Sequence, residues 1–389
     1  MTAVRRRPAR STGAPVSTIT FDVTEEQQLL ASTVRDALGK RATSARVREV
    51  MMTDLAVDED GWRELAGLGL VGLLVPEAHG GAGAGAVEAA GVLEELGRTL
   101  LPVPYLASAV LGATALVHGA DEAQRDRLLP DVAAGTTVAT LAHLDDRGRI
   151  AADPGVRAVR DGDAWTLSGT AGFVLDGLRA DLVVTAAVTD DGLQLFAVRS
   201  DADGLTRERV PVLDLTRPMA TLTYDRVVVA DADRLAGDAV AGLHRALTAG
   251  TVLLASEQLG VADRSLALVT AYAKERVQFG RAIGSFQAVK HRIAELLVDV
   301  EAARSTAMHA ARALAAGDPA EVAVATPLAA AWCAEVAQTA TQDLIQLHGG
   351  IGFTWEHDAH LYFKRAKASL LLLGSPSHHR RLLADVLDL

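Results

Sequence analysis

The stretch "RVQFGRAIGSFQ", residues 276–287, decides how the C-terminal part of this chain folds. Residues 243–276 before it and residues 286–316 after it have the spacing of apolar residues that is typical of helices. Each segment is far longer than the average globular helix, which indicates a helical bundle. The stretch between them contains two glycines that interrupt the helices, together with aromatic and polar side chains that a simple turn does not require.

The region before residue 134 also has helical patterning. Thr24 and Gln27 form the sequence signature of a capping box, and Leu30, Val34 and Leu38 then recur every four residues. The run from Thr99 to Ala120 has no formal charge, but Pro102 and Pro104 interrupt it near its start. The remainder is too short to span a bilayer, so we predict a buried helix and no membrane segment.

Residues 135–235 differ from the regions on either side. Asp161-Gly162 and Asp191-Gly192 are hairpin signals, and they separate short runs rich in β-branched residues. This pattern predicts an antiparallel β domain. The predicted strands cover residues 156–160, 164–168, 182–188, 193–198 and 221–229.

The predicted fold is therefore α+β and multi-layered, with four parts in chain order. A disordered tail (1–18) is followed by an N-terminal helical domain (19–134), a middle β domain (135–235) and a C-terminal four-helix bundle (236–389). In the bundle, Gly317 ends one helix, and Asp318 and Pro319 begin the next. No GxGxxG loop follows a strand, so a Rossmann domain is not expected.

Composition excludes some classes of function. The net charge of the 389-residue chain is −11, which argues against a nucleic-acid surface. Its one cysteine, Cys333, fits a small core residue in a reducing compartment, so we predict a cytoplasmic protein. The first 18 residues carry four arginines but no apolar segment, which argues against a secretory signal.

Two stretches resemble the signature sequences of the acyl-CoA dehydrogenase family. These are "YAKERVQFGRAIGSFQAVKHRIAEL" (272–296) and "IQLHGGIGFTWEHDAHLYFKRAK" (345–367). "LVPEAHGGAG" and "EELGR" resemble parts of the family's N-terminal domain, so the resemblance covers nearly the whole chain after residue 20. It implies the acyl-CoA dehydrogenase fold and an enzyme that desaturates acyl-CoA thioesters with FAD. It also implies a tetramer, with electron-transfer flavoprotein as the electron acceptor.

The family binds FAD across a subunit interface, and the resemblance assigns residues to that site. Arg276 would reach the FAD pyrophosphate, for which a planar guanidinium is well suited. Taken alone, Arg276 is equally well explained as a surface residue at a helix C-terminus. Of the other residues, Gln278 and Phe279 would flank the adenosine half, Phe286 and Gln287 would lie near adenine, and Gln346, Leu347, His348, Gly349 and Gly350 would line the other partner's side of the same groove.

The catalytic base of the family has no counterpart at either position where members carry it. Many members place a glutamate near the C-terminus, where this chain has Leu373, and others place it on the helix before RxQFG, where this chain has Gly250. Neither residue accepts a proton. Glu257 lies two turns further on, about 10 Å along the axis, which makes it a weak candidate for the catalytic residue. A structural carboxylate paired with an arginine is the alternative explanation of Glu257, and the one that the sequence favours.

The residues that contact the flavin ring also depart from the family pattern. "ATLAHLDDRGR" (139–149) replaces the Thr-Glu-x-Gly-Ser-Asp-like loop of many relatives. Phe173-Val174-Leu175 replaces a Trp-Ile-Thr contact, so the threonine hydroxyl is missing. The elements for the ADP half of FAD are thus retained, whereas those for the reactive ring and the base are not.

Three functions follow from this pattern. The first is a subunit that completes the FAD site of a partner chain, as in α2β2 enzymes of actinobacterial steroid catabolism. The second is a self-sufficient dehydrogenase that uses Glu257 or another base, and the third is a dehydratase or scaffold without redox chemistry. No metal site is expected, because His291 and His348 have no ligands at suitable spacing and "HHRR" (378–381) fits a solvated surface.

Overall fold

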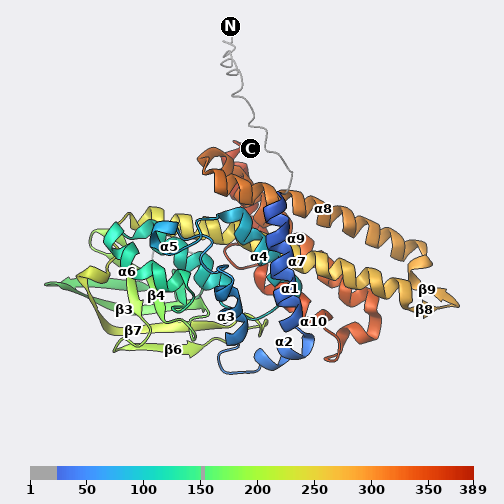
Figure 1. The fold of residues 1–389 in the computed structure, drawn as a ribbon, viewed down its shortest axis with the longest axis horizontal. Helices are drawn as coiled ribbons and strands as arrows, with labels where there is room; N and C mark the ends of the chain where they lie inside the picture. Colours follow the sequence, from blue (N-terminus) through green and yellow to red (C-terminus); the bar gives the residue numbers. More distant parts are fainter. Residues whose placement is uncertain (1–23, 150–153) are drawn as a thin grey trace, which may run out of the picture.

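A computed structural model describes residues 24–149 and 154–389. The predicted tail, residues 1–18, lies outside the described residues. Figure 1 shows the β-sheet at one end of the long axis of the molecule and the tip of a long helical hairpin at the other. The predicted order of helices, strands and helices is confirmed.

The N-terminal region is helical up to Ala133. The predicted capping box is present, because the Gln27 amide donates to Thr24 Oγ1 and the Thr24 amide donates to Gln27 Oε1, each at 3.2 Å. The uncharged run after Thr99 forms a buried π-helix and a short α-helix, as expected. The elements of this region are α1 (Glu25–Arg41), α2 (Ser44–Val50), α3 (Glu59–Gly67), η1 (Glu77–His79), α4 (Ala86–Thr99), η2 (Tyr105–Gly112), α5 (Ala113–Gly119) and α6 (Glu122–Ala133).

The middle region forms one sheet with the strand order β1-β4-β2-β3-β7-β6, and β5 pairs with β4 outside this path. All five predicted strands are present, whereas β1 and β6 were missed. The strands are β1 (Ala139–Ala142), β2 (Val156–Asp161), β3 (Ala164–Leu175), β4 (Leu182–Thr189), β5 (Gly192–Arg199), β6 (Leu205–Arg209) and β7 (Met219–Ala230), and η3 (Asp231–Asp233) follows them.

The sheet is mixed, so the prediction of a purely antiparallel domain was wrong. β1 runs parallel to β4, with Ala139 opposite Leu182, and β2 meets β4 in parallel at Arg157 and Val188. The two hairpin signals predicted the antiparallel β2–β3 and β4–β5 pairs correctly. A turn signal reports only strands joined by a short loop, and therefore says nothing about β1 and β4, which are far apart in the sequence.

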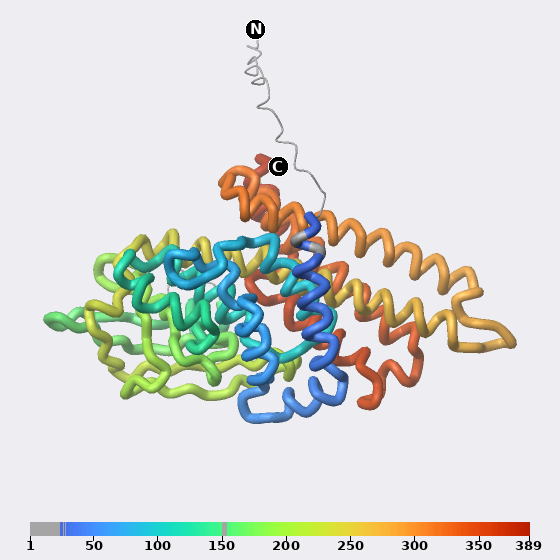
Figure 2. The backbone as a smooth tube through the Cα atoms, viewed as in Figure 1, coloured from blue at the N-terminus to red at the C-terminus, as the bar shows by residue number. Residues whose placement is uncertain are grey.

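The C-terminal region is built on three long helices, α7 (Ala239–Glu275), α8 (Gln287–Ala316) and α9 (Pro319–His348). Asp318 caps α9 as predicted, since its carboxylate accepts a 3.0 Å hydrogen bond from the Ala320 amide. Two short helices, α10 (Ala359–Ser369) and α11 (Pro376–Val386), complete the region. Figure 2 shows α7 running along much of the molecule, from the sheet end toward the hairpin tip.

Helix α7 lies in the core and contacts all three parts of the fold. Two glycines let it approach α4 closely, because a Cβ on Gly97 would overlap the Glu257 carbonyl and a Cβ on Gly260 would overlap the Glu94 carbonyl. By length and composition α7 and α9 resemble membrane spans, but 61% and 50% of their apolar windows are buried inside the fold. They are therefore core helices. Cys333 on α9 is also buried, and burial raises the pKa of its thiol to about 12.

Candidate cofactor and active site

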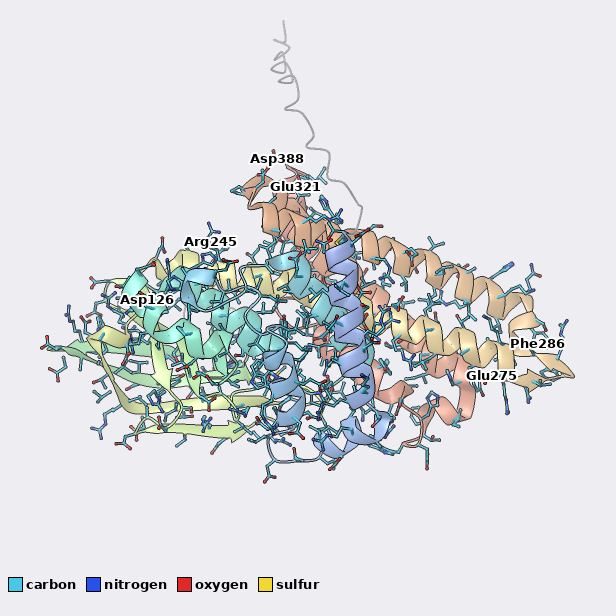
Figure 3. The ribbon with its side chains drawn as sticks, viewed as in Figure 1. Asp126, Arg245, Glu275, Phe286, Glu321 and Asp388 are labelled. Atoms are coloured by element: carbon cyan, nitrogen blue, oxygen red, sulfur yellow. The ribbon has the colours of Figure 1, made fainter. Side chains whose placement is uncertain are left out.

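The stretch 276–287 forms a tight β-hairpin between α7 and α8. Its strands are β8 (Val277–Gln278) and β9 (Arg281–Ala282), and the 3-10 turn η4 (Ile283–Ser285) leads into α8. Phe279 and Gly280 form the two-residue loop, with φ of 51° and 76°, so both lie in the left-handed region that such loops require. Glycine adopts this conformation freely, whereas Phe279 does so with its side chain 92% exposed. Figure 3 shows the labelled Glu275 and Phe286 at this tip, remote from the sheet.

The polar side chains of this hairpin are largely free to bind a ligand. Arg276 is exposed, and its guanidinium has no hydrogen-bond or ion-pair partner among the described residues. Gln278 donates only to its neighbour's carbonyl, from Nε2 to the oxygen of Val277 at 2.9 Å. Phe286 is half-buried, with the guanidinium carbon of Arg281 4.1 Å from its ring centre, and Gln287 is exposed. The tip therefore offers cationic, amide and aromatic groups to solvent.

The second motif ends α9 beside this hairpin. The ring of His348 stacks on Tyr272, one turn before Arg276, with ring centres 4.1 Å apart. The Tyr272 hydroxyl also donates to the His348 carbonyl at 3.4 Å. We expected the two motifs to line opposite sides of a groove between partners. Within one chain the structure brings the ends of both motifs together, because the end of α7 packs on the end of α9. The expected placement on opposite sides of a groove between partners stays a prediction.

The backbone after His348 is open. A Cβ placed on Gly349 or Gly350 would have no atom within 4 Å, and Gly349 has a φ of 62°. Gln346 is exposed and Leu347 half-buried on the last turn of α9. Open glycine backbone and a free guanidinium suit a diphosphate, and an exposed aromatic ring suits a nucleoside base. The residues present therefore fit the ADP half of FAD.

The two positions that carry the base in relatives meet in space in this chain. A Cβ built on Gly250 would lie 3.0 Å from Leu373 Cδ1 and 2.5 Å from Leu111 Cδ2. The two positions therefore mark the same place in the fold. Leucine side chains fill it, and neither Gly250 nor Leu373 offers a carboxylate there. Leu373 has a φ of 58° and is buried.

Glu257 belongs to a buried network of charges. Its Oε2 accepts from Arg217, and its Oε1 lies 3.2 Å from Arg365 Nη1, which donates to it. Arg365 Nε also donates to Asp214 at 2.5 Å, and its Nη2 donates to the Thr216 hydroxyl at 2.6 Å. Only 3% of Glu257 is exposed, so both of its oxygens are shielded from solvent and engaged by cations. This geometry favours a structural carboxylate over a base.

Asp176 lies beside this network, and no ion pair involving it is found among the described residues. It lines a cavity of about 20 Å³ together with Arg217, Glu257 and Arg365, and apolar side chains of α4 and η2 close the other side. Burial raises the pKa of Asp176 to about 7, although the nearby arginines oppose this. With Asp176 protonated, the two arginines balance the carboxylates of Asp214 and Glu257, and the cluster is neutral.

The loop that replaces the flavin-ring loop of relatives is closed on itself. The Asp145 carboxylate accepts from the amides of Arg147 and Arg149, at 3.0 and 2.8 Å, and from the Arg149 side chain at 2.7 Å. The ring of Phe173 packs on Gly148, where a Cβ would lie 2.6 Å from it. His143, just after β1, is buried, and neither ring nitrogen has a hydrogen-bond partner among the described residues. Burial lowers the pKa of His143 to about 4.

Comparison with known proteins decides the family. The C-terminal domain model of acyl-CoA dehydrogenases matches residues 241–387, and the N-terminal domain model matches residues 24–136. This chain belongs to the acyl-CoA dehydrogenase family. Members of the family bind FAD and are flavin-dependent oxidoreductases.

Several relatives of this acyl-CoA dehydrogenase family member come from mycobacteria. It is 38% identical to the acyl-CoA dehydrogenase IpdE2 of Mycobacterium tuberculosis, over 93% of this chain and 98% of that one. It is 35% identical to IpdE2 of Mycolicibacterium smegmatis, over 94% of this chain and 100% of that one. Among solved structures, the ChsE4–ChsE5 complex of Mycobacterium tuberculosis matches with a TM-score of 0.87, 31% identity, and coverage of 95% and 99%. A single-residue variant of the Tcur3481–Tcur3483 steroid enzyme matches with a TM-score of 0.84 and 37% identity. The match covers 94% of this chain and 98% of that one.

Sequence reasoning missed the partners of Glu257. Asp214, Arg217 and Arg365 are buried, and a buried charge in a sequence looks the same as a solvated one until its partners are known. A weak signal was present, since "DLTRP" (214–218) places an acid and an arginine beside a proline at a strand start.

One histidine, His79, has acidic neighbours that lie far from it in the sequence. His79 Nδ1 lies 2.9 Å from Asp126 Oδ1, and Glu122 is nearby on α6. Both carboxylates are exposed, and the contact is explained by a hydrogen bond that fixes η1 against α6. The absence of a metal site therefore stays a prediction.

Proposed function

We propose that this chain is a subunit of a hetero-oligomeric acyl-CoA dehydrogenase and completes the FAD site of a partner chain. FAD, when bound, supplies the acceptor for the hydride removed during α,β-desaturation of the acyl-CoA. Arg276 would bind the diphosphate, the open backbone at Gly349 and Gly350 would approach it, and Phe279 would flank the adenosine. The base that removes the α proton would belong to the partner.

The observation that carries this proposal is the contrast between two sets of residues in one chain. The surface suited to the ADP half is open, with the guanidinium of Arg276 unpaired within the described part of the chain. The place of the base is filled by Leu373 and Leu111, and the ring loop is closed by Asp145 and Arg149. A chain that catalysed the reaction by itself would need a carboxylate at the place of the base and a loop open to the flavin ring.

The names of two similar structures support a partner of the same family. One is a complex of ChsE4 and ChsE5, and the other is a steroid enzyme with a double name, Tcur3481–Tcur3483. By analogy we propose a hetero-tetramer acting on the CoA thioester of a steroid-derived acid, with electron-transfer flavoprotein as the electron acceptor and the cytoplasm as the compartment. The domain limits at residues 134/135 and 235/236 are likewise our proposal.

The geometry gives the two alternatives less support. A self-sufficient enzyme based on Glu257 would have to release that carboxylate from Arg217 and Arg365 before it accepted a proton. A scaffold without redox chemistry leaves the exposed Arg276 and Phe279 unexplained.

The test is purification of the chain alone and after co-expression with each acyl-CoA dehydrogenase subunit encoded nearby. We expect the isolated chain to lack the visible absorption of bound flavin, and one pair to bind FAD and reduce it with an acyl-CoA. Bound FAD and turnover in the isolated chain would refute the partner role. Absence of flavin from every pair would refute the cofactor role.

A further inference from the structure

The segment that follows Gly349 and Gly350 is anchored to the N-terminal domain by two charged residues. Arg48, on α2, donates from Nη2 to Asp358 Oδ1 at 2.7 Å and to the His357 carbonyl at 3.2 Å. The Ser44 hydroxyl, one turn earlier on α2, donates to the same Asp358 oxygen at 2.5 Å. One face of α2 thus binds both the backbone and the side chain of the segment between η5 (Gly349–Phe353) and α10.

Asp358 stands at the N-cap of α10, but its side chain does not cap that helix. An aspartate at this position normally accepts from an amide of the first turn. Here the amide of Ala359 donates to the Nδ1 of His357 instead, at 3.1 Å, which leaves the Asp358 carboxylate for Arg48 and Ser44. The Asp358 carboxylate therefore does not cap its own helix but contacts Arg48 and Ser44 of the N-terminal domain.

His357 connects the anchored segment to the Gly349–Gly350 backbone, which suits the cofactor. Its ring lies 4.3 Å from that of His348, and His348 in turn stacks on Tyr272 at 4.1 Å. Gly349 is the next residue after His348. The position of the open glycine backbone is therefore fixed from one side by α7 through Tyr272 and from the other by α2 through Arg48, Asp358 and His357.

We propose that Arg48 and Asp358 are positioning residues for FAD: their ion pair holds the ring of His357 against His348 and thereby aligns the Gly349–Gly350 backbone with Arg276. This inference rests on the proposed FAD site and adds to it residues that do not touch the cofactor. Hydrogen-bond donors for a diphosphate lose strength steeply when they are misplaced or misaligned, which is why a contact at this distance from the ligand affects affinity.

The Arg48–Asp358 pair is suited to a clean test, because its loss should leave the fold intact. The side chains of Arg48 and Asp358 are 24% and 35% exposed, and ion pairs of this kind contribute little to folding. The variants are Arg48→Met and Asp358→Asn. The control is Arg63→Met, which removes an exposed arginine paired with Asp60 inside α3.

The measurement is the Kd of FAD for the complex with the partner chain, with ADP as a competing probe. We expect Arg48→Met and Asp358→Asn each to raise the Kd of FAD and of ADP by about tenfold. We expect Arg63→Met to leave both unchanged. The flavin spectrum and kcat at saturating FAD should not change, because in the proposed site the flavin ring would be held by the partner. The double variant Arg48→Asp/Asp358→Arg should recover part of the lost affinity.

Two failures are distinguishable. If Arg276→Ala weakens FAD binding but Arg48→Met and Asp358→Asn do not, the positioning role is refuted and the proposed site stands. If Arg276→Ala has no effect either, the proposed site itself is refuted.

Discussion

The middle and the C-terminal end of helix α7 differ in how their charged side chains are placed. Near the middle, Glu257 is buried and both of its oxygens are engaged by arginines from outside the helix. Just beyond the C-terminus, Arg276 is exposed and has no partner among the described residues. A buried charge without a partner is very costly, whereas an exposed one is already solvated and remains available. Glu257 therefore stabilises the fold, whereas Arg276 is suited to bind a ligand.

The strongest test of this comparison is Glu257→Gln. The substitution leaves Arg217 and Arg365 with one carboxylate fewer in a buried site, so we expect a loss of about 4 kcal/mol in the free energy of unfolding, measured by urea denaturation. Glu275→Gln, at the exposed end of the same helix, is the control and should change it by less than about 0.5 kcal/mol. A Glu257→Gln protein of normal stability that binds FAD and no longer turns over would identify Glu257 as the base.

The pH dependence of stability tests the third acid beside this buried centre. Burial raises the pKa of Asp176 to about 7, so the folded state holds a proton that the unfolded state releases at about pH 4. Stability should therefore fall as pH rises from about 4 to 7. Asp176→Asn removes this dependence and should stabilise the protein at pH 8, by at most about 4 kcal/mol at 1.4 kcal/mol per pKa unit.

Thermal unfolding of the wild type and Asp176→Asn across that range measures the difference. The difference should vanish below about pH 3, where both states of the wild type bind the proton. His143 contributes with the opposite sign, since its lowered pKa costs stability as pH falls from about 6.5 to 4, but equally in both proteins. Equal curves for the two proteins would mean that Asp176 is ionised at neutral pH.

At the C-terminal end of α7, Arg276→Ala should act on the ligand and not on the fold. Loss of a charge-assisted contact to a diphosphate costs about 2 kcal/mol, or about 30-fold in the Kd of FAD. Folding stability should stay within about 0.5 kcal/mol, because the guanidinium has no partner to lose among the residues that the structure describes. Lys274→Ala, an exposed cation on the last turn of α7, is the matched control. A large loss of stability in Arg276→Ala would contradict the distinction between the two regions.

The smallest effect should come from Phe279→Ala. The side chain is 92% exposed, so its removal should change folding stability by less than about 0.5 kcal/mol. The affinity for FAD should fall only a few-fold, about 0.5–1 kcal/mol for one lost aromatic contact. Titration of the complex with FAD measures this, with the exposed Val277→Ala as control. Phe279 meets Phe286 edge-on within the subunit, with ring centres 6.1 Å apart. Marked destabilisation of the isolated chain would mean that this contact, and not a ligand, accounts for Phe279.

The sequence predicted most of the helical and strand segments, the capping box at Thr24 and the family. These features depend on residues near one another in the chain: Thr24 and Gln27 fix a helix start, and Asp161-Gly162 fixes a hairpin. It also indicated that Leu373 and Gly250 cannot act as the base, since side-chain chemistry is enough for that conclusion.

Contacts between residues far apart in the chain became visible only in the folded protein. The parallel pairing of β1 with β4, the arginines around Glu257, and the contact of Tyr272 with His348 all join segments that no local pattern connects. The same holds for Arg48 and Asp358, which lie on α2 and at the start of α10. Ion pairs and parallel strands are set by packing in three dimensions, and their energies depend on burial, which a sequence does not state.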